Sequence, residues 1–135
     1  MSETRRDRTP SARVGQRVTH RRYVPHSDAH YAGNLVAGAY SLAAFGDVAT
    51  ELCILTDGDE GLFASYSDVQ FRAPVRGGDV IEISAALVRV GRRSRELDFE
   101  VRVVCRGTPE RGASGAGVLD PPLVATTARG VVVVP

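Results

Sequence analysis

The chain has no lysine, because all 17 of its basic residues are arginine. This absence excludes Schiff-base chemistry and every mechanism that uses a lysine nucleophile. Cysteine is scarce as well, and the two cysteines, Cys53 and Cys105, do not form a CxxC pair. Such isolated cysteines are typical of small buried side chains in a reducing compartment. We therefore expect a cytoplasmic protein without a disulfide.

Motifs for metal, nucleotide and serine-hydrolase chemistry are missing too. The sequence has no HExxH, CxxC or paired-histidine spacing, so it predicts no metal site. It has no GxGxxG or Walker motif, and GASGAG at 112–117 is more typical of a loop. The absence of a GxSxG turn argues against a serine hydrolase. We expect neither a metal nor a cofactor.

Charge and hydropathy restrict the partners. The formal net charge is +1, which gives no electrostatic reason to expect nucleic acid. No apolar run nears the roughly 20 residues that span a membrane, and no signal-peptide pattern opens the chain. Seven arginines nevertheless lie in the first 22 residues. Residues 1–15 are predicted to be a flexible arm, either solvated or docking an acidic partner such as a carrier protein, and residues 16–135 a single domain.

The pattern along this domain predicts one helix and a set of antiparallel strands. Asn34 is a plausible N-cap for a helix over 35–55 that ends in the turn Asp57-Gly58-Asp59. Strands are predicted over 17–24, 62–73, 80–90, 96–105 and 123–134, with a mobile loop over 107–120. A long, nearly uncharged helix followed by four strands indicates an α+β fold, in which a curved antiparallel sheet wraps around a central helix.

The predicted helix carries only two charges, Asp47 and Glu51. At about 100° per residue these acids fall on one stripe with Tyr40 and Ala44, opposite the apolar arc. Carboxylates in an otherwise uncharged helix are expensive to bury. A buried carboxylate pair near His30 therefore favours proton-transfer chemistry over a structural role.

Three stretches carry a family resemblance. VQFRAPVRGGD at 69–79 resembles the strand–turn–strand signature of the hot-dog fold superfamily, in which a sheet wraps around a central helix. HYAGNLVAGA at 30–39 and FGDVATEL at 45–52 resemble the β-aminoacyl-CoA ammonia lyases. They are equally similar to bacterial biosynthetic thioesterases that add an amine, typically glycine, to an α,β-unsaturated acyl thioester and then hydrolyse it. The resemblance covers roughly 16–134 and implies a homodimer with sites at the interface.

Both branches need a polarised thioester carbonyl and groups that move protons. The expected helix start near Gly33, Asn34 and Leu35 offers free backbone N–H groups to the carbonyl oxygen. His30 and Glu51 are the candidates for moving protons. Asp47 is the alternative base or the group that orients a water, a role that the resemblance to hot-dog thioesterases supports. Asn34 is also a candidate to orient the carbonyl or the amine.

Other residues are candidates for substrate contact. Tyr23, Tyr31 and Tyr66 are proposed to line the pocket, although packing explains Tyr31 equally well. Arg92 and Ser94, with Arg93, are candidates for a pantetheine or nucleotide phosphate, with an exposed turn as the alternative. His20 and His26 are expected to be exposed.

Four functions stay open from the sequence. Our first hypothesis is addition of glycine to an enoyl thioester of coenzyme A or an acyl-carrier protein, followed by hydrolysis. The second is a β-aminoacyl-CoA ammonia lyase, and the third a simple acyl-CoA thioesterase. A non-catalytic module that binds acyl thioesters is the fourth.

Overall fold

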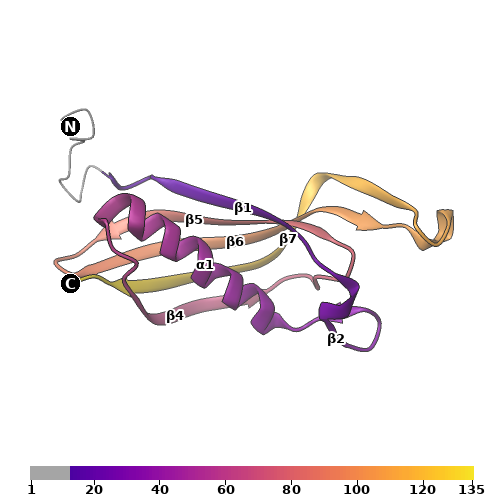
Figure 1. Ribbon diagram of the computed structural model, residues 1–135, viewed down its shortest axis with the longest axis horizontal. Coiled ribbons are helices and arrows are strands. Elements are labelled where there is room, and N and C mark those ends of the chain that lie inside the picture. Colours follow the sequence, from indigo (N-terminus) through magenta and orange to yellow (C-terminus); the bar gives the residue numbers. More distant parts are fainter. Residues whose placement is uncertain (1–12) are drawn as a thin grey trace.

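The computed structural model describes residues 13–135. Its centre is one antiparallel sheet of five strands in the order β1-β5-β6-β7-β4, with one long helix across a face of the sheet (Figure 1). The strands are β1 (Arg17–Tyr23), β4 (Leu62–Phe71), β5 (Val80–Val90), β6 (Ser94–Gly107) and β7 (Ala116–Val133). A small second sheet pairs β2 (Ala29–Tyr31) with β3 (Leu35–Val36), and short 3-10 turns occupy His26–Asp28 (η3) and Pro109–Arg111 (η4). The predicted α+β architecture is confirmed.

The helix α1 (Gly38–Asp57) starts three residues later than the sequence indicates. Ala37 is the N-cap residue and makes no side-chain capping bond, so the prediction that Asn34 caps the helix is wrong. Asn34 instead lies in the turn between β2 and β3 with a φ of 62°. The C-terminus is as expected, because Gly58 takes the left-handed conformation that ends helices (φ 66°) and its N–H binds the Ile54 carbonyl.

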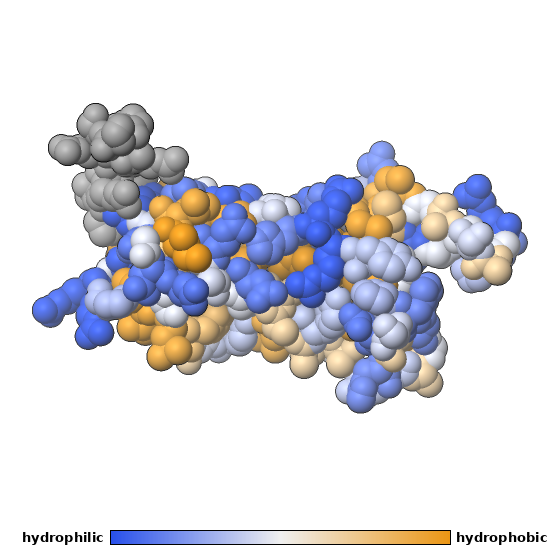
Figure 2. All heavy atoms as spheres, viewed as in Figure 1, coloured by the Kyte–Doolittle hydropathy of each residue, from blue (hydrophilic) through white to orange (hydrophobic). Residues whose placement is uncertain are grey.

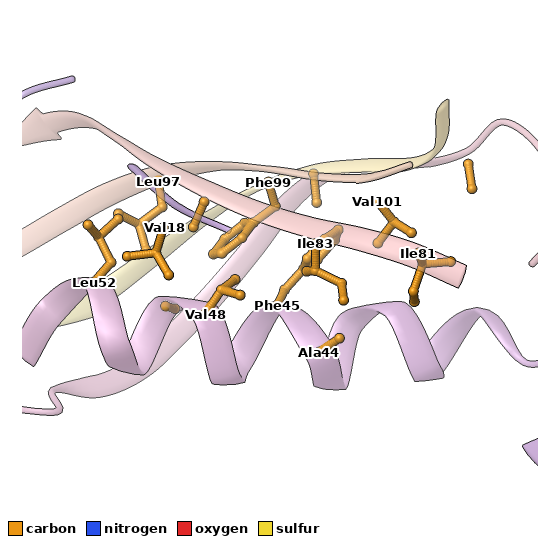
Figure 3. Close-up of a cluster of buried hydrophobic side chains, with 14 of the residues drawn as sticks. Val18, Ala44, Phe45, Val48, Leu52, Ile81, Ile83, Leu97, Phe99 and Val101 are labelled. Atoms are coloured by element: carbon orange, nitrogen blue, oxygen red, sulfur yellow. The ribbon is translucent and has the colours of Figure 1, made fainter. Parts of the chain in front are cut away.

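The core lies between α1 and the sheet (Figure 3). Alternate residues of β5 and β6 point toward the helix, as the period of a strand requires. These buried side chains are Ile81, Ile83, Ala85 and Leu87 on β5 and Leu97, Phe99, Val101 and Val103 on β6. Phe45 of α1 stacks on Phe99 with 4.8 Å between ring centroids. Each large side chain buried here contributes about 1.5–3 kcal/mol.

The face of α1 that packs on the sheet differs from the apolar face that the sequence predicts. Its buried residues are Ser41, Ala44, Phe45, Val48, Ala49, Leu52, Cys53 and Thr56. Ala44, expected on the stripe of the acids, is buried, whereas Ala39 and Ala43 of the predicted apolar arc are exposed. Alanine contributes little to a hydrophobic pattern, so the three aromatic and branched residues Phe45, Val48 and Leu52 decide which side faces the sheet.

The predicted mobile loop over 107–120 is shorter in the structure, because both of its ends belong to strands. β6 and β7 continue as a paired hairpin that projects beyond the rest of the sheet (Figure 1), with register Cys105↔Val118 and Gly107↔Ala116. Only residues 108–115, which include η4, form its irregular tip. We call residues 105–118 the hairpin arm.

The structure adds detail at the N-terminal end of the domain and on the apolar character of α1. Of the predicted arm, residues 1–12 lie outside the described residues, but Gly15 donates to the Leu87 carbonyl (2.8 Å), so the domain extends at least to the residues just before β1. By length and composition alone α1, with 20 residues and a mean hydropathy of 1.2, is long and apolar enough to cross a membrane. Here it packs on the sheet as the core helix, a kind of helix that passes the same test.

Candidate active site

A hollow of about 360 Å³ lies at the start of α1. We call it the helix-start hollow; its lining is Val36, Ala37, Gly38, Ser41, residues 71–75 and Thr126. The ring of Phe71 lies against Gly38 so closely that a Cβ there would be 2.7 Å from its Cε1 atom. The first amides of a helix have no partner inside the helix, so this hollow is bordered by N–H donors that suit a carbonyl oxygen. Because α1 starts at Gly38, these free amides are those of Gly38 and Ala39, whereas Gly33, Asn34 and Leu35 precede the helix and their contact with the substrate stays a prediction.

The two helix acids contact β1 in a regular arrangement. His20 Nε2 lies 2.6 Å from Glu51 Oε1, and Arg22 Nη2 lies 3.4 Å from Asp47 Oδ2. The prediction that these carboxylates are buried is wrong for the single chain, because 52% of the Glu51 side chain and 68% of the Asp47 side chain are exposed. Figure 2 shows the side of the molecule on which α1 lies in Figure 1, where hydrophilic side chains run across the middle beside hydrophobic patches.

Sequence reasoning missed the strand partners of these acids. Residues 20 and 22 project from the same face of β1, and residues 47 and 51 lie one turn apart on α1. The sequence does contain a signal, because basic residues alternate on the strand and acids stand at i and i+4 on the helix. This signal predicts no contact unless it is known that β1 packs against α1.

The helix start and the acids do not meet within one chain. Asp47 and Glu51 follow Gly38 by nine and thirteen residues on one straight helix. With a rise of about 1.5 Å per residue, they lie about 14 Å and about 20 Å further along the axis. The α-carbon is bonded directly to the thioester carbonyl, so the reacting atoms of one thioester cannot lie at the helix-start amides and at either carboxylate of the same chain at once.

The buried carboxylates of the described chain are Asp57 and Asp79. The Asp57 side chain is only 10% exposed and accepts hydrogen bonds from Arg95 (2.8 to 3.1 Å). Burial alone would raise the pKa of Asp57, but hydrogen bonds from Arg95 and Thr56 and the positive charges of Arg95 and Arg13 lower it below the usual 3.8. Asp79 is fully buried and bound by Arg106 at 2.8 and 3.0 Å. Both groups are structural, because each carboxylate is saturated by a guanidinium.

The resemblance motif at 30–39 forms the turn between β2 and β3. Asn34 Nδ2 donates to the Gly77 carbonyl (2.8 Å), while Gly77 N–H donates to the Asn34 carbonyl (3.0 Å). These two hydrogen bonds hold the turn against residues 76–78, and Leu35 forms an isolated β-bridge with Arg76. His30 is exposed and meets the ring of Tyr31 edge-on at 4.8 Å. The catalytic role of His30 stays a prediction, as does substrate contact by Tyr31.

Three of the predicted site residues line a second hollow, of about 550 Å³. Tyr23, Gly33 and Asn34 form one wall, residues 76–79 the floor and the hairpin arm the other wall. Gly33 has a φ of 78°, a conformation that favours glycine. We call this the arm hollow.

The remaining predicted residues lie elsewhere. The Tyr66 hydroxyl donates to the Leu42 carbonyl (2.6 Å) and its ring packs on Phe63, so burial raises its pKa to about 12. Arg92 belongs to the turn between β5 and β6, and Ser94 is the first residue of β6, at the end of the molecule where Arg95 binds the last residue of α1. Neither hollow contains them. Within residues 13–135, no group of three His, Cys, Asp or Glu side chains is arranged to hold a metal.

Comparison with known proteins gives the family. Residues 33–109 match the thioesterase superfamily. The chain is 49% identical to 3-aminobutyryl-CoA ammonia lyase of Acetoanaerobium sticklandii over 108 aligned residues. The alignment covers 80% of this chain and 86% of that protein. It superposes on β-alanyl-CoA:ammonia lyase of Clostridium propionicum with a TM-score of 0.85 and 37% identity, covering 90% of this chain and 86% of that one.

A more distant match concerns the fold alone. A hexameric hot-dog thioesterase of Campylobacter jejuni superposes with a TM-score of 0.69 at 20% identity, over 86% of this chain and 80% of that one. Together with the match to the β-alanyl-CoA:ammonia lyase structure, this superposition confirms the fold that the motif at 69–79 predicts. The chain therefore belongs to the thioesterase superfamily, as an enzyme with the hot-dog fold.

Proposed function

We propose that this enzyme catalyses the reversible addition of ammonia to a short α,β-unsaturated acyl-CoA, as a β-aminoacyl-CoA ammonia lyase. The observation that carries the proposal is the identity of 49% and 37% to two ammonia lyases over most of both chains. The hot-dog thioesterase named above is only 20% identical and supports the fold alone. The comparisons thus favour our second hypothesis over the first, in which glycine is added and the thioester hydrolysed.

Elimination of ammonia needs a base and a stabilised enolate. In the proposed mechanism the Glu51 carboxylate accepts the α-proton, and the electron pair of the Cα–H bond moves into the thioester carbonyl to give an enolate. The enolate pair then forms the Cα=Cβ bond as the Cβ–N bond breaks, and ammonia leaves with the electron pair of that bond. Negative charge grows on the thioester oxygen as the proton leaves, and the amides at the start of α1 are its proposed donors. Asp47 is the proposed anchor for the positively charged β-ammonium group of the substrate.

The separation of these groups supports a site built from two copies of the chain. Because about 14–20 Å of helix lies between the amides and the acids of one chain, a second copy must bring its carboxylates to the helix start. The outer face of α1 has exposed apolar residues that suit such a contact, among them Ile54 and Leu55 at 46% and 45% exposure. The edge strand β4 adds Leu62 and Phe71 at 75% and 57% exposure. We therefore propose at least a homodimer.

The first experiment offers the enzyme a three- or four-carbon 2-enoyl-CoA with ammonium or with glycine and follows the products by mass spectrometry. We expect a β-aminoacyl-CoA with its thioester intact from ammonium, and release of ammonia in the reverse direction. A free glycine adduct would restore the first hypothesis, and hydrolysis without amine addition would make the enzyme a simple thioesterase. The Glu51→Gln variant should lose at least about 100-fold in kcat.

A mixing experiment tests the two-chain site. Gly38→Val, which fills the helix-start hollow, and Glu51→Gln should each be nearly inactive alone. If each site takes its helix start from one chain and its carboxylate from the other, refolding the two variants together should restore about a quarter of the wild-type activity, since half of the dimers are mixed and each has one intact site. No recovery on mixing would show that the site lies within one chain.

A further inference from the structure

His20 makes the shortest side-chain contact between β1 and α1. The distance from His20 Nε2 to Glu51 Oε1 is 2.6 Å. A carboxylate oxygen only accepts hydrogen bonds, so in this contact the Nε2 atom carries the proton and donates. The second carboxylate oxygen of Glu51 has no hydrogen-bond partner among residues 13–135. The histidine thus holds one oxygen and leaves the other open.

The neighbouring contact differs in both strength and chemistry. Arg22 lies 3.4 Å from Asp47, and its guanidinium is shared with the ring of Tyr40, 5.3 Å from the ring centroid. That long contact does not fix the orientation of the Asp47 carboxylate. Of the two exposed acids on α1, Glu51 alone has a short hydrogen bond that sets its rotamer.

From this arrangement we infer that His20 is a positioning residue for Glu51. Its Nε2–H donates to Oε1, which turns Oε2 toward the α-carbon of the substrate for proton transfer. The inference rests on the proposed function, in which Glu51 is the base. Orientation of a base within hydrogen-bond reach of its proton is a requirement of general base catalysis.

The test compares His20→Ala with His20→Gln in ammonia elimination from 3-aminobutyryl-CoA, together with exchange of the α-proton in deuterated water. The alanine variant should lose about tenfold in kcat and in α-proton exchange, with KM changed less than about threefold. Glutamine places a donor N–H near the former Nε2, so His20→Gln should stay within about threefold of the wild type. Melting curves verify that both variants are folded.

A matched control lies beside His20 on the same strand. Arg21 points to the opposite face of β1 and binds Glu82 at 2.6 Å, so Arg21→Gln removes an ion pair of similar length away from Glu51 and should leave kcat unchanged. Wild-type kcat in His20→Ala beside an inactive Glu51→Gln would overturn the inference, as would equal impairment of the alanine and glutamine variants. Full activity of Glu51→Gln would also overturn the inference, because it would show that Glu51 is not the base. A wild type without lyase activity would overturn the proposed function.

Discussion

Breaking the ion pair between Asp57 and Arg95 should destabilise the fold more than any surface substitution. The Arg95 side chain is 6% exposed and makes a forked contact with the Asp57 carboxylate at 2.8 to 3.1 Å. Its remaining nitrogen binds the carbonyls of Gly91 (3.0 Å) and Ser94 (2.9 Å). One guanidinium therefore ties the end of α1 to the turn between β5 and β6.

The expected loss of folding stability follows from the groups that each variant leaves without a partner. Arg95→Met leaves the buried Asp57 carboxylate with only the longer contact to Arg13 (3.4 Å) and the hydrogen bond from Thr56, and it leaves two carbonyls without their donor. Asp57→Asn leaves the buried Arg95 guanidinium without its counter-charge. Loss of one partner of a buried pair costs about 3–5 kcal/mol. For a domain of this length, that corresponds to a drop of roughly 10–20 °C in the melting temperature. The double variant removes both charges of the pair and should cost less than the sum of the two single variants.

Thermal unfolding followed by circular dichroism, at one fixed protein concentration, measures all three variants. The pKa of Asp57 is lowered in the folded state, so its stabilisation is present above the unfolded value near 3.8 and is lost as the pH falls below it. The gap between wild type and Asp57→Asn should therefore narrow below about pH 4. Single variants that melt within about 3 °C of the wild type, or a double variant equal to their sum, would refute the reasoning.

Three further predictions concern single groups. Burial, and next the negative charge of Asp57, raise the pKa of Cys53 to about 11, so native protein at pH 8 should react with a thiol reagent at Cys105 alone and show its second thiol only after unfolding. Tyr66→Phe removes the hydrogen bond to a backbone carbonyl and should lower the free energy of unfolding by about 1 kcal/mol, measured in urea. Gly38→Ala drives its Cβ to 2.7 Å from the Phe71 ring, so kcat/KM for the enoyl-CoA should fall several-fold and recover when Phe71→Leu is added; unchanged kinetics of the single variant would contradict this.

The strands and the helix end were predictable because they depend on local signals. The run over 80–90 was predicted with the bounds that β5 has, since alternation and flanking turns define a strand. Gly58 marks the end of α1 for the same local reason. The start of α1 was not predictable in this way, because the bonds of Asn34 to Gly77, 43 residues away, draw it into a turn instead of a cap. The hairpin arm was missed because a Gly- and Pro-rich sequence hides pairing that only the partner strand fixes.

The residues of the candidate site also differ in whether local sequence or long-range packing reveals them. Gly33 and Asn34 lie in a motif of the resemblance and Tyr23 was proposed apart from it, and the fold assembles all three around the arm hollow. Motif similarity gave no sign of His20, which gains meaning only through the packing of β1 on α1. Arg92 and Ser94 were chosen for their chemistry in a turn, yet that turn lies at the end of α1 away from both hollows.

The error about the helix acids has a physical meaning of its own. A nearly uncharged helix indicates cover on all sides, but the sequence does not say whether the cover comes from the same chain. The sheet covers the side of Phe45 and leaves Ala43, Asp47 and Glu51 exposed. Under the proposed two-chain site, a second copy covers this side and carries its acids to the helix-start amides. The same apolar pattern then accounts for both the core of one chain and the contact between two.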